Sequence, residues 1–275
     1  MTIVPLAGVI GHPVGHSKSP RLHGHWLHTR GIIGHYVPLD VAAADLPAVL
    51  RLLPRIGFRG VNVTIPHKEA VLALADDVTP LARKVGAANT LTFVNGTIHA
   101  DNTDGYGFMA NLRDGAPKWR PGDGPVLILG AGGAARAIIV ALADAGTSEI
   151  RLVNRTRARA EELAAELGGP LHVLDWSERA TAAECAALVV NTTALGMQGQ
   201  PPLGFPATAL APETVVTDIV YTPLVTPLLA SAHDRGRTVV DGLGMLLHQA
   251  APGFARWFGE VPEVTPELRA HVLAP

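Results

Sequence analysis

The sequence predicts an α/β protein made of two successive units. Stretches typical of strands and of helices alternate along its 275 residues, as expected for parallel sheets with helices packed on their faces. In the second half, the apolar run 126–129 leads directly into a glycine-rich turn and then an alanine-rich helical stretch. That junction is typical of a Rossmann-type dinucleotide-binding domain with a parallel sheet. The chain is long enough to hold another α/β domain before it.

Each predicted element follows from local periodicity and from turn residues. In the first unit strands are expected at 3–10, 33–39, 60–65 and 90–94, and helices at 18–30, 43–56, 67–75 and 79–86. The polar segment 113–124 leads into the second unit. There, strands are expected at 125–129, 149–153, 187–191, 214–219 and 237–240, separated by alanine-rich helices. The last long helix, 243–258, contains Pro252 and Gly253, which we expect to break or bend it.

Composition excludes several classes of function. Hydrophobic residues make up 48% of the chain and charged residues 17%, and the net charge is −2. Such a chain is globular and has no broad basic surface for nucleic acid. We expect no membrane partner, because no apolar run is long enough to span a bilayer. The amino terminus lacks a basic segment before its apolar residues, which predicts a cytoplasmic protein.

Cys185 is the only cysteine. No intramolecular disulfide is therefore possible, and its apolar neighbours predict a buried thiol without a chemical role.

His16, His23, His25 and His28 crowd the first loop and helix. No two of them have the i, i+4 spacing on one helix face, and no nearby cysteine or glutamate completes a set of ligands, so we predict no metal site.

The glycine-rich turn favours binding of a dinucleotide. Gly130 permits a tight turn, Gly132 lets the backbone approach a pyrophosphate, and Ala135 is small enough for close packing of helix on strand. The following strand ends at Asn154 instead of the acidic residue that usually binds an NAD ribose, and Arg155 follows it. This favours NADP. The alternative is that the arginines here only pair with glutamates of the next helix.

Lys68 follows a strand that Pro66 ends. Ligands bind beyond the carboxyl ends of strands in open α/β sheets. The alternative for Lys68 is a solvated charge in a first helical turn, where a cation is unfavourable.

Ser17 and Ser19 share a loop and can both donate to one carboxylate, or one of them can cap the next helix.

Two further polar residues stand at the edges of elements. Asn89 precedes an apolar strand, and Asp104 lies in a turn before a helix, where it can act in a site, as an N-cap, or as both.

Taken together, these motifs resemble the shikimate dehydrogenase family, in order and along nearly the full chain. The matching segments are "GHSKSPRLH", "GVNVTIPHKEA", "GAANTL", "DNTDGYG", "GAGGAARA", "NRT", "DIVYTPLVTPLL" and "DGLGMLLHQAA". The resemblance implies reversible, NADPH-dependent reduction of 3-dehydroshikimate to shikimate, on the route to aromatic amino acids. It also implies a substrate-binding catalytic domain at 1–104, an NADP-binding Rossmann domain at 105–242, and carboxy-terminal helices at 243–275 that pack back on the first domain.

The resemblance also implies which residues form the site. For the substrate these are Ser17, Ser19, Thr64, Lys68, Asn89, Asp104, Tyr221 and Gln249. For NADP they are Gly130, Ala131, Gly132, Gly133, Ala134, Asn154, Arg155, Thr156, Arg159, Ile219 and Gly242, with Arg157 also within the motif. Reduction of a ketone needs a proton donor, for which we expect Lys68 and Asp104. Whether Lys68 gives the proton or holds the charge while Asp104 relays it stays open.

The chain departs from the family pattern at His67, where an aromatic residue is common, and at Gly24, where an asparagine is common. A quinate/shikimate dehydrogenase using NAD is one alternative, which Arg155 disfavours. A methylene-tetrahydrofolate dehydrogenase would lack the paired serines and the "DNTDG" turn. A catalytically silent sensor of NADPH or of a cyclic acid would not need both Lys68 and Asp104. The oligomeric state stays open, with a homodimer as one alternative.

Overall fold

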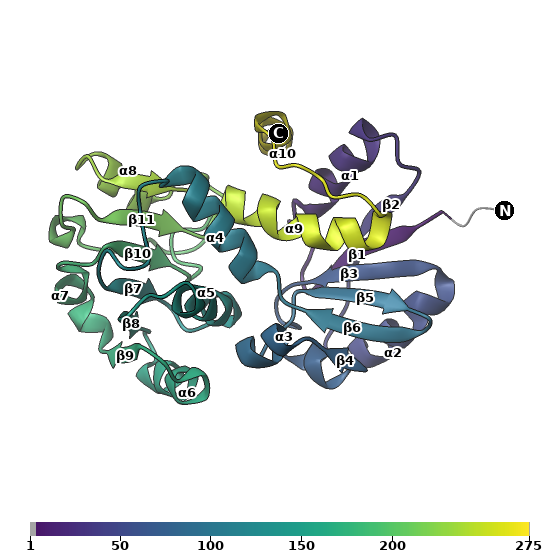
Figure 1. Ribbon diagram of the computed structural model, residues 1–275, viewed down its shortest axis with the longest axis horizontal. Helices are drawn as coiled ribbons and strands as arrows, with labels where there is room; N and C mark the ends of the chain where they lie inside the picture. The colour runs from purple at the N-terminus through teal and green to yellow at the C-terminus, as the bar shows by residue number, and fades with distance from the viewer. Residues whose placement is uncertain (1–3, 275) are drawn as a thin grey trace. The chain divides into compact units, whose positions relative to one another are not determined.

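The computed structural model describes residues 4–274 and divides into two compact units (Figure 1). The first unit contains the described residues up to Asp104 together with those from Leu246 onward. The second unit is Gly105–Met245. The chain therefore leaves the first unit after Asp104 and rejoins it within its last long helix.

The first unit is built on a six-stranded sheet. Its strands are β1 (Leu6–Gly11), β2 (His35–Asp40), β3 (Phe58–Val63), β4 (Asp77–Val78), β5 (Thr90–Val94) and β6 (Thr97–Asp101), in the order β2-β1-β3-β5-β6-β4. β1 pairs in parallel with β2 and β3, whereas β5 is antiparallel to both β3 and β6. The expectation of parallel pairing throughout this half is therefore wrong. Asn95 and Gly96, at φ 51° and 82°, form a tight hairpin that reverses the chain between β5 and β6.

Helices surround this sheet. They are α1 (Ser19–Thr29), α2 (Leu46–Leu52), α3 (Pro80–Val85), α9 (Leu243–Phe258) and α10 (Pro266–Leu273), with short 3-10 turns η1 (Leu53–Ile56) and η2 (Ala70–Ala73). The helix expected at 67–75 is only the η2 turn. α10 packs beside α1, where Lys18 donates to the Val272 carbonyl at 3.0 Å. A core of buried aliphatic and aromatic side chains, Leu50, Val61 and Leu91 among them, lies between sheet and helices.

Helix α9 continues through Pro252 and Gly253, so the break that was one of the two predicted outcomes does not occur. Packing compensates for the hydrogen bond that Pro252 cannot donate, because Phe254 and Trp257 are almost fully buried. Gly253 has a packing role, since a Cβ here would meet the Trp257 ring at 2.9 Å. Trp257 Nε1 also donates to the Leu91 carbonyl at 3.1 Å. Tertiary contacts therefore hold the helix where local propensity would end it.

The second unit has a six-stranded sheet in which every pairing is parallel. Its strands are β7 (Val126–Leu129), β8 (Ile150–Val153), β9 (Leu171–Leu174), β10 (Leu188–Asn191), β11 (Val215–Asp218) and β12 (Thr238–Val240), in the order β12-β11-β10-β7-β8-β9. Its helices and turns are α4 (Asp104–Gly115), α5 (Gly133–Asp144), α6 (Arg157–Leu167), η3 (Trp176–Glu178), α7 (Arg179–Ala183), η4 (Ala207–Ala209) and α8 (Pro227–His233). This order is that of a Rossmann sheet and reverses between β7 and β10, which confirms the predicted fold class. Strand β9 was not predicted.

Cys185 is exposed, so the prediction of a buried thiol is wrong. It lies in the turn between α7 and β10 and has a φ of 60°. The neighbouring Ala183 and Ala186 are buried instead. The apolar residues around Cys185 therefore belong to the ends of two elements, while the cysteine lies in the turn that joins them.

Candidate functional site

Three chain segments meet at one edge of the first unit's sheet. Lys68 follows β3, Asn89 precedes β5, and Asp104 follows β6. Because β5 is antiparallel to both neighbours, its beginning lies beside the ends of β3 and β6, as the pairing of Asn62 with Thr90 and of Thr90 with Asp101 shows. The antiparallel hairpin therefore brings together residues that are far apart in the sequence.

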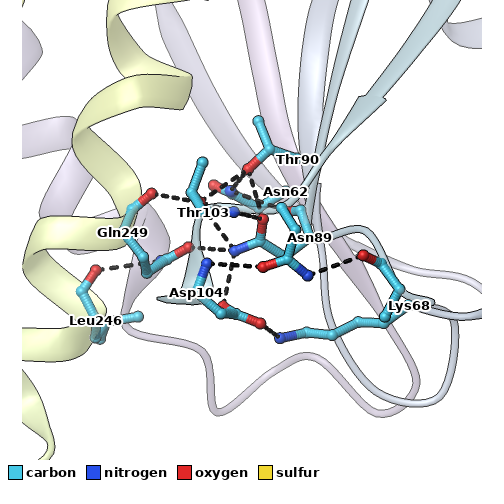
Figure 2. A network of polar contacts seen from close by, with 10 residues as sticks. Asn62, Lys68, Asn89, Thr90, Thr103, Asp104, Leu246 and Gln249 are labelled. Atoms are coloured by element: carbon cyan, nitrogen blue, oxygen red, sulfur yellow. Dashed lines mark hydrogen bonds and ion pairs between the residues drawn. The ribbon is translucent and has the colours of Figure 1, made fainter. Parts of the chain in front are cut away.

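Lys68 and Asp104 form an ion pair at this edge. The distance from Lys68 Nζ to Asp104 Oδ2 is 2.5 Å, and the two side chains are 18% and 6% exposed. Figure 2 shows both side chains pointing toward each other from opposite segments. An ammonium has three donors, so two N–H groups of Lys68 are left for a bound oxygen. The Lys68 carbonyl accepts from the Ala88 N–H at 2.8 Å, which fixes this segment against the loop before β5.

Asn89 joins the ion pair to helix α9. Its Nδ2 donates to Asp104 Oδ1 at 2.8 Å and to Gln249 Oε1 at 2.9 Å (Figure 2). Its Oδ1 accepts from the backbone N–H of Thr103 at 2.8 Å, and Thr103 Oγ1 donates to the Gln249 carbonyl at 2.8 Å. The structure thus brings together four of the predicted site residues: Lys68, Asn89, Asp104 and Gln249.

Sequence reasoning missed the residues that support this group. Asn62, Thr90 and Thr103 are all buried and hydrogen bonded within it. The Asn95-Gly96 dipeptide between two alternating stretches was the signal that could have found them, because it predicts a hairpin. A hairpin there places the start of β5 beside the end of β6.

The paired serines lie where α1 begins. The backbone N–H of Ser19 donates to Ser17 Oγ at 3.3 Å, and Ser19 is buried. The N-cap position of α1 is Lys18, which makes no capping hydrogen bond through its side chain. Ser17 therefore binds one N–H of the first helical turn but is not the helix cap, and the proposed carboxylate role of both hydroxyls stays a prediction.

Thr64 lies directly after β3, where its N–H donates to the Ile10 carbonyl at 2.9 Å. The two departures from the family pattern are accommodated in different ways. His67 is buried, and its Nε2 lies 2.7 Å from the Val41 carbonyl, to which it must donate because a carbonyl only accepts. Gly24 is an exposed residue of α1 with no atom within 4 Å of the position of a Cβ.

The glycine loop of the second unit lies at the point where the strand order reverses. Gly130 ends β7 with φ +109°, and a Cβ there would meet Thr192 Oγ1 at 2.7 Å. Ala131 and Gly132 continue the turn, and nothing lies within 4 Å of a Cβ on Gly132. Gly133 and Ala134 open α5, whose first turn carries no acidic residue. Free helix N–H groups and an open approach fit a pyrophosphate.

The turn after β8 presents cationic side chains. Asn154 Nδ2 donates to the Thr156 carbonyl at 2.8 Å, and Thr156 precedes α6. Arg157 is bound to Glu161 and Asp175 at 2.8 and 2.9 Å. Arg155 and Arg159 are exposed, and within residues 4–274 neither guanidinium forms an ion pair. Two free arginines and no carboxylate at the strand end fit a 2′-phosphate.

The other predicted residues of this unit follow β11 and β12. Gly242 packs on the backbone of Ile219, since a Cβ there would lie 2.4 Å from the Ile219 carbonyl. Asp218 is buried and accepts from the Val220 N–H at 3.0 Å and from Asn191 and Thr226 side chains, which fixes this loop. Burial raises the pKa of Asp218. Tyr221 lies in the same loop, and burial raises the pKa of its hydroxyl.

Across the described part of the chain, histidine, cysteine and carboxylate side chains do not gather in threes that could hold a metal ion. Nor is any helix there both long and apolar enough to cross a membrane.

Comparison with known proteins agrees with the residues found in each of the two units. Residues 9–91 match a model described as the shikimate dehydrogenase substrate-binding domain, and residues 121–196 match one described as shikimate/quinate 5-dehydrogenase. Shikimate dehydrogenase (NADP(+)) of Paracoccus denitrificans is 62% identical over 98% of this chain and 96% of its own length.

Two solved structures share the fold. Shikimate 5-dehydrogenase of Thermus thermophilus, in complex with NADP(H) and shikimate, is 39% identical over 98% of each chain with a TM-score of 0.87. Quinate dehydrogenase of Corynebacterium glutamicum, in complex with NAD, is 31% identical over 98% of this chain and 99% of that chain, with a TM-score of 0.91. With its lysine–aspartate pair, its glycine loop and these relatives, the chain belongs to the shikimate dehydrogenase family.

Proposed function

We propose that this protein is an NADP-dependent shikimate dehydrogenase that interconverts 3-dehydroshikimate and shikimate. The observation that carries the proposal is the ion pair of Lys68 and Asp104, 2.5 Å apart at a sheet edge with Asn89 and Gln249 beside it. The relative from Paracoccus denitrificans is named for this NADP-dependent activity. A cytoplasmic location and a homodimer stay predictions.

The chemistry needs a proton at the substrate oxygen. When bound, NADPH would supply a hydride for the ketone carbon, and negative charge would then develop on the carbonyl oxygen. Lys68 donates to this oxygen, stabilises its negative charge and gives it a proton. Asp104 keeps the ammonium in place through the 2.5 Å contact and balances its charge. In the oxidative direction the same pair removes the proton from the hydroxyl.

The neighbouring amides hold the rest of the ring. Asn89 and Gln249 are almost fully buried, and their polar groups lie next to Asp104, where they can bind ring hydroxyls. Ser17 and Ser19 bind the ring carboxylate through their hydroxyls, and Thr64 and Tyr221 contribute further hydroxyl groups. Each is a proposed role, supported for the serines by their adjacent positions at the start of α1.

The cofactor is bound by the loop 130–134, the residues Asn154, Arg155, Thr156 and Arg159, and the backbone around Ile219 and Gly242. A preference for NADP over NAD is supported by the two unpaired arginines and by the amide, in place of a carboxylate, at Asn154. NAD appears in the complex of the quinate dehydrogenase relative. That makes quinate with NAD the second candidate, and cofactor choice is the feature that separates the two.

The purified protein tests this proposal directly. With shikimate and NADP+, it should form NADPH and 3-dehydroshikimate in equal amounts. A silent sensor would bind the cofactor or the acid, as detected by calorimetry, without forming either product. Binding without product would overturn the proposed reaction.

A further inference from the structure

Tyr36, in the edge strand β2, is a buried phenol held between aromatic rings. It is 8% exposed and stacks on the His23 imidazole with ring centroids 3.9 Å apart and an interplanar angle of 3°. Trp26, Phe254 and Trp257 surround the same imidazole at 5.6 to 5.8 Å. This packing fixes the direction in which the phenol oxygen points.

The hydroxyl of Tyr36 must donate to Asn62. Tyr36 Oη lies 2.7 Å from Asn62 Oδ1. The other end of the Asn62 amide faces the Asn89 carbonyl at 3.2 Å, and a carbonyl only accepts. The amide nitrogen therefore faces that carbonyl and the amide oxygen faces the phenol. Tyr36 is consequently the donor, and Asn62 Oδ1 depends on it.

A chain of hydrogen bonds connects Asn62 to the ion pair. Asn62 Nδ2 also donates to Thr90 Oγ1 at 3.3 Å, which leaves the Thr90 proton for Asn89 Oδ1 at 3.0 Å. With its oxygen held by Thr90 and by the Thr103 N–H at 2.8 Å, the Asn89 amide directs Nδ2 to Asp104 Oδ1 at 2.8 Å. Figure 2 shows this sequence of contacts from Asn62 to Asp104. In each of these four contacts, from Tyr36 to Asp104, the residue nearer Tyr36 is the donor.

Two further observations concern the proton of the Tyr36 phenol and its neighbour Ser19. Burial raises the pKa of Tyr36 well above its usual value, against a smaller opposing effect of a hydrogen bond with Ser19. The phenol therefore keeps the proton that it donates to Asn62. Ser19, the residue whose hydroxyl has this opposing effect on the pKa of Tyr36, is one of the two hydroxyls proposed to bind the ring carboxylate.

We propose that Tyr36 is a positioning residue, which acts through Asn62, Thr90 and Asn89 to hold the Asp104 carboxylate against Lys68. The inference rests on the proposed function for its effect on turnover, while the hydrogen-bond relay itself does not depend on the reaction. Loss of the phenol proton removes the one hydrogen-bond donor that Asn62 Oδ1 has within residues 4–274, which frees the amide to reorient.

Matched hydroxyl deletions test the relay through turnover. Tyr36→Phe and Thr90→Val should each lower kcat for shikimate about tenfold, equal to about 1.4 kcal/mol of barrier. Thr92→Val is the control, because Thr92 lies on the same strand and its buried Oγ1 has no hydrogen-bond partner within the described residues. It should keep wild-type kcat. KM for NADP+ should stay unchanged in all three variants.

The double variant separates a relay from general loosening. In the Thr90→Val background, Tyr36→Phe should lower kcat little further, because the relay is already broken. Losses that multiply would show two independent structural effects and overturn the inference, as would a Tyr36→Phe enzyme with normal kcat. If Tyr36→Phe does not fold, Thr90→Val compared with Thr92→Val tests the relay from its middle.

A measurement without turnover keeps this inference distinct from the proposed function. The side-chain amide resonances of Asn62 and Asn89, followed by 1H–15N NMR, should shift in Tyr36→Phe and in Thr90→Val but not in Thr92→Val. Shifts in a protein that does not oxidise shikimate would sustain the relay and overturn only the reaction. An unmoved Asn89 resonance in both relay variants would overturn the relay.

Discussion

Lys68 Nζ lies 2.5 Å from Asp104 Oδ2, and the other oxygen of the same carboxylate accepts from Asn89 Nδ2 at 2.8 Å. Both carboxylate oxygens are therefore bound, one by the segment after β3 and the other by the residue before β5. An arrangement of this kind orients the ammonium without solvent reorganisation when charge develops on a substrate oxygen. The predictions for activity follow from this relationship.

Replacing Lys68 should remove most turnover. Lys68→Met keeps an unbranched side chain of nearly the same length but has no ammonium proton to donate and no charge, so kcat should fall about 10²-fold or more. The Kd for NADPH should change little, because the cofactor residues are in the other unit. Stopped-flow or steady-state kinetics with shikimate measure kcat, and fluorescence titration measures the Kd for NADPH. Lys118→Met, which alters an exposed lysine of the second unit, is the control. Near-normal kcat in Lys68→Met would remove the lysine from the mechanism.

The paired serines should govern binding of the ring carboxylate. The double variant Ser17→Ala with Ser19→Ala should raise KM for shikimate and reduce the preference over analogues that lack the carboxylate. Since Ser17 Oγ accepts one backbone N–H at 3.3 Å, a loss of stability on the order of 1 kcal/mol is also expected. A variant that loses stability while KM stays at the wild-type value would assign the serines to the helix start alone.

Arg155 should set the choice of cofactor. Arg155→Ala should weaken NADP about ten- to a hundredfold and leave NAD nearly unchanged, because one charge-assisted hydrogen bond contributes roughly 1.5–3 kcal/mol. Arg159 can take over part of this contact. Arg157→Ala is the matched control, since Arg157 is already bound to Glu161 and Asp175. Measured Kd values that rise equally for both cofactors in Arg155→Ala would show that the arginine only supports the helix start.

His23 should make the fold sensitive to acid. Burial lowers the pKa of His23 to about 3, against a smaller opposing effect of the Asn62 side chain. Within the described residues, neither ring nitrogen of His23 has a hydrogen-bond partner. The folded state therefore stays neutral at His23 while the unfolded state takes up a proton below about pH 6.5. Stability is fully present above that pH and is lost as the pH falls toward 3, by about 1.4 kcal/mol per pH unit.

Urea unfolding at several pH values measures this contribution. Between neutral pH and about pH 5, His23→Phe should lose about 2 kcal/mol less stability than the wild type. The exposed His35 provides the control, and His35→Asn should keep the wild-type pH dependence. The same pH dependence in all three proteins would show that His23 takes up a proton in the folded state.

Much of the fold followed from local pattern. The parallel sheet of the second unit was predictable because its strands are continuous apolar runs, and the glycine turn of Gly130 has a specific backbone requirement (φ +109°). The antiparallel pairing of β5 was missed because helix–strand alternation was read as parallel throughout, while the Asn95-Gly96 turn was overlooked. Pro252 and Cys185 were misjudged for one reason. The continuation of a helix through Pro252 and the exposure of Cys185 both depend on tertiary packing, which the neighbouring residues in the sequence do not reveal.

The site was predictable where chemistry leaves a motif. Lys68, Asn89 and Asp104 were found because each stands at the edge of a predicted element. Tyr36 and Asn62 were not, since a tyrosine and an asparagine within strands have no local pattern that marks them. Their roles depend on the register that places Asn62 opposite Thr90. Supporting residues of this kind become visible only when the strands are paired.

The most direct test is the specificity of the wild-type protein for its two substrates. kcat/KM is to be measured for shikimate and for quinate, each with NADP+ and with NAD+. We predict that shikimate with NADP+ is used best and that NAD+ lowers kcat/KM about tenfold or more, as the loss of the 2′-phosphate contact requires. Equal use of both cofactors, or a preference for quinate with NAD+, would contradict this prediction.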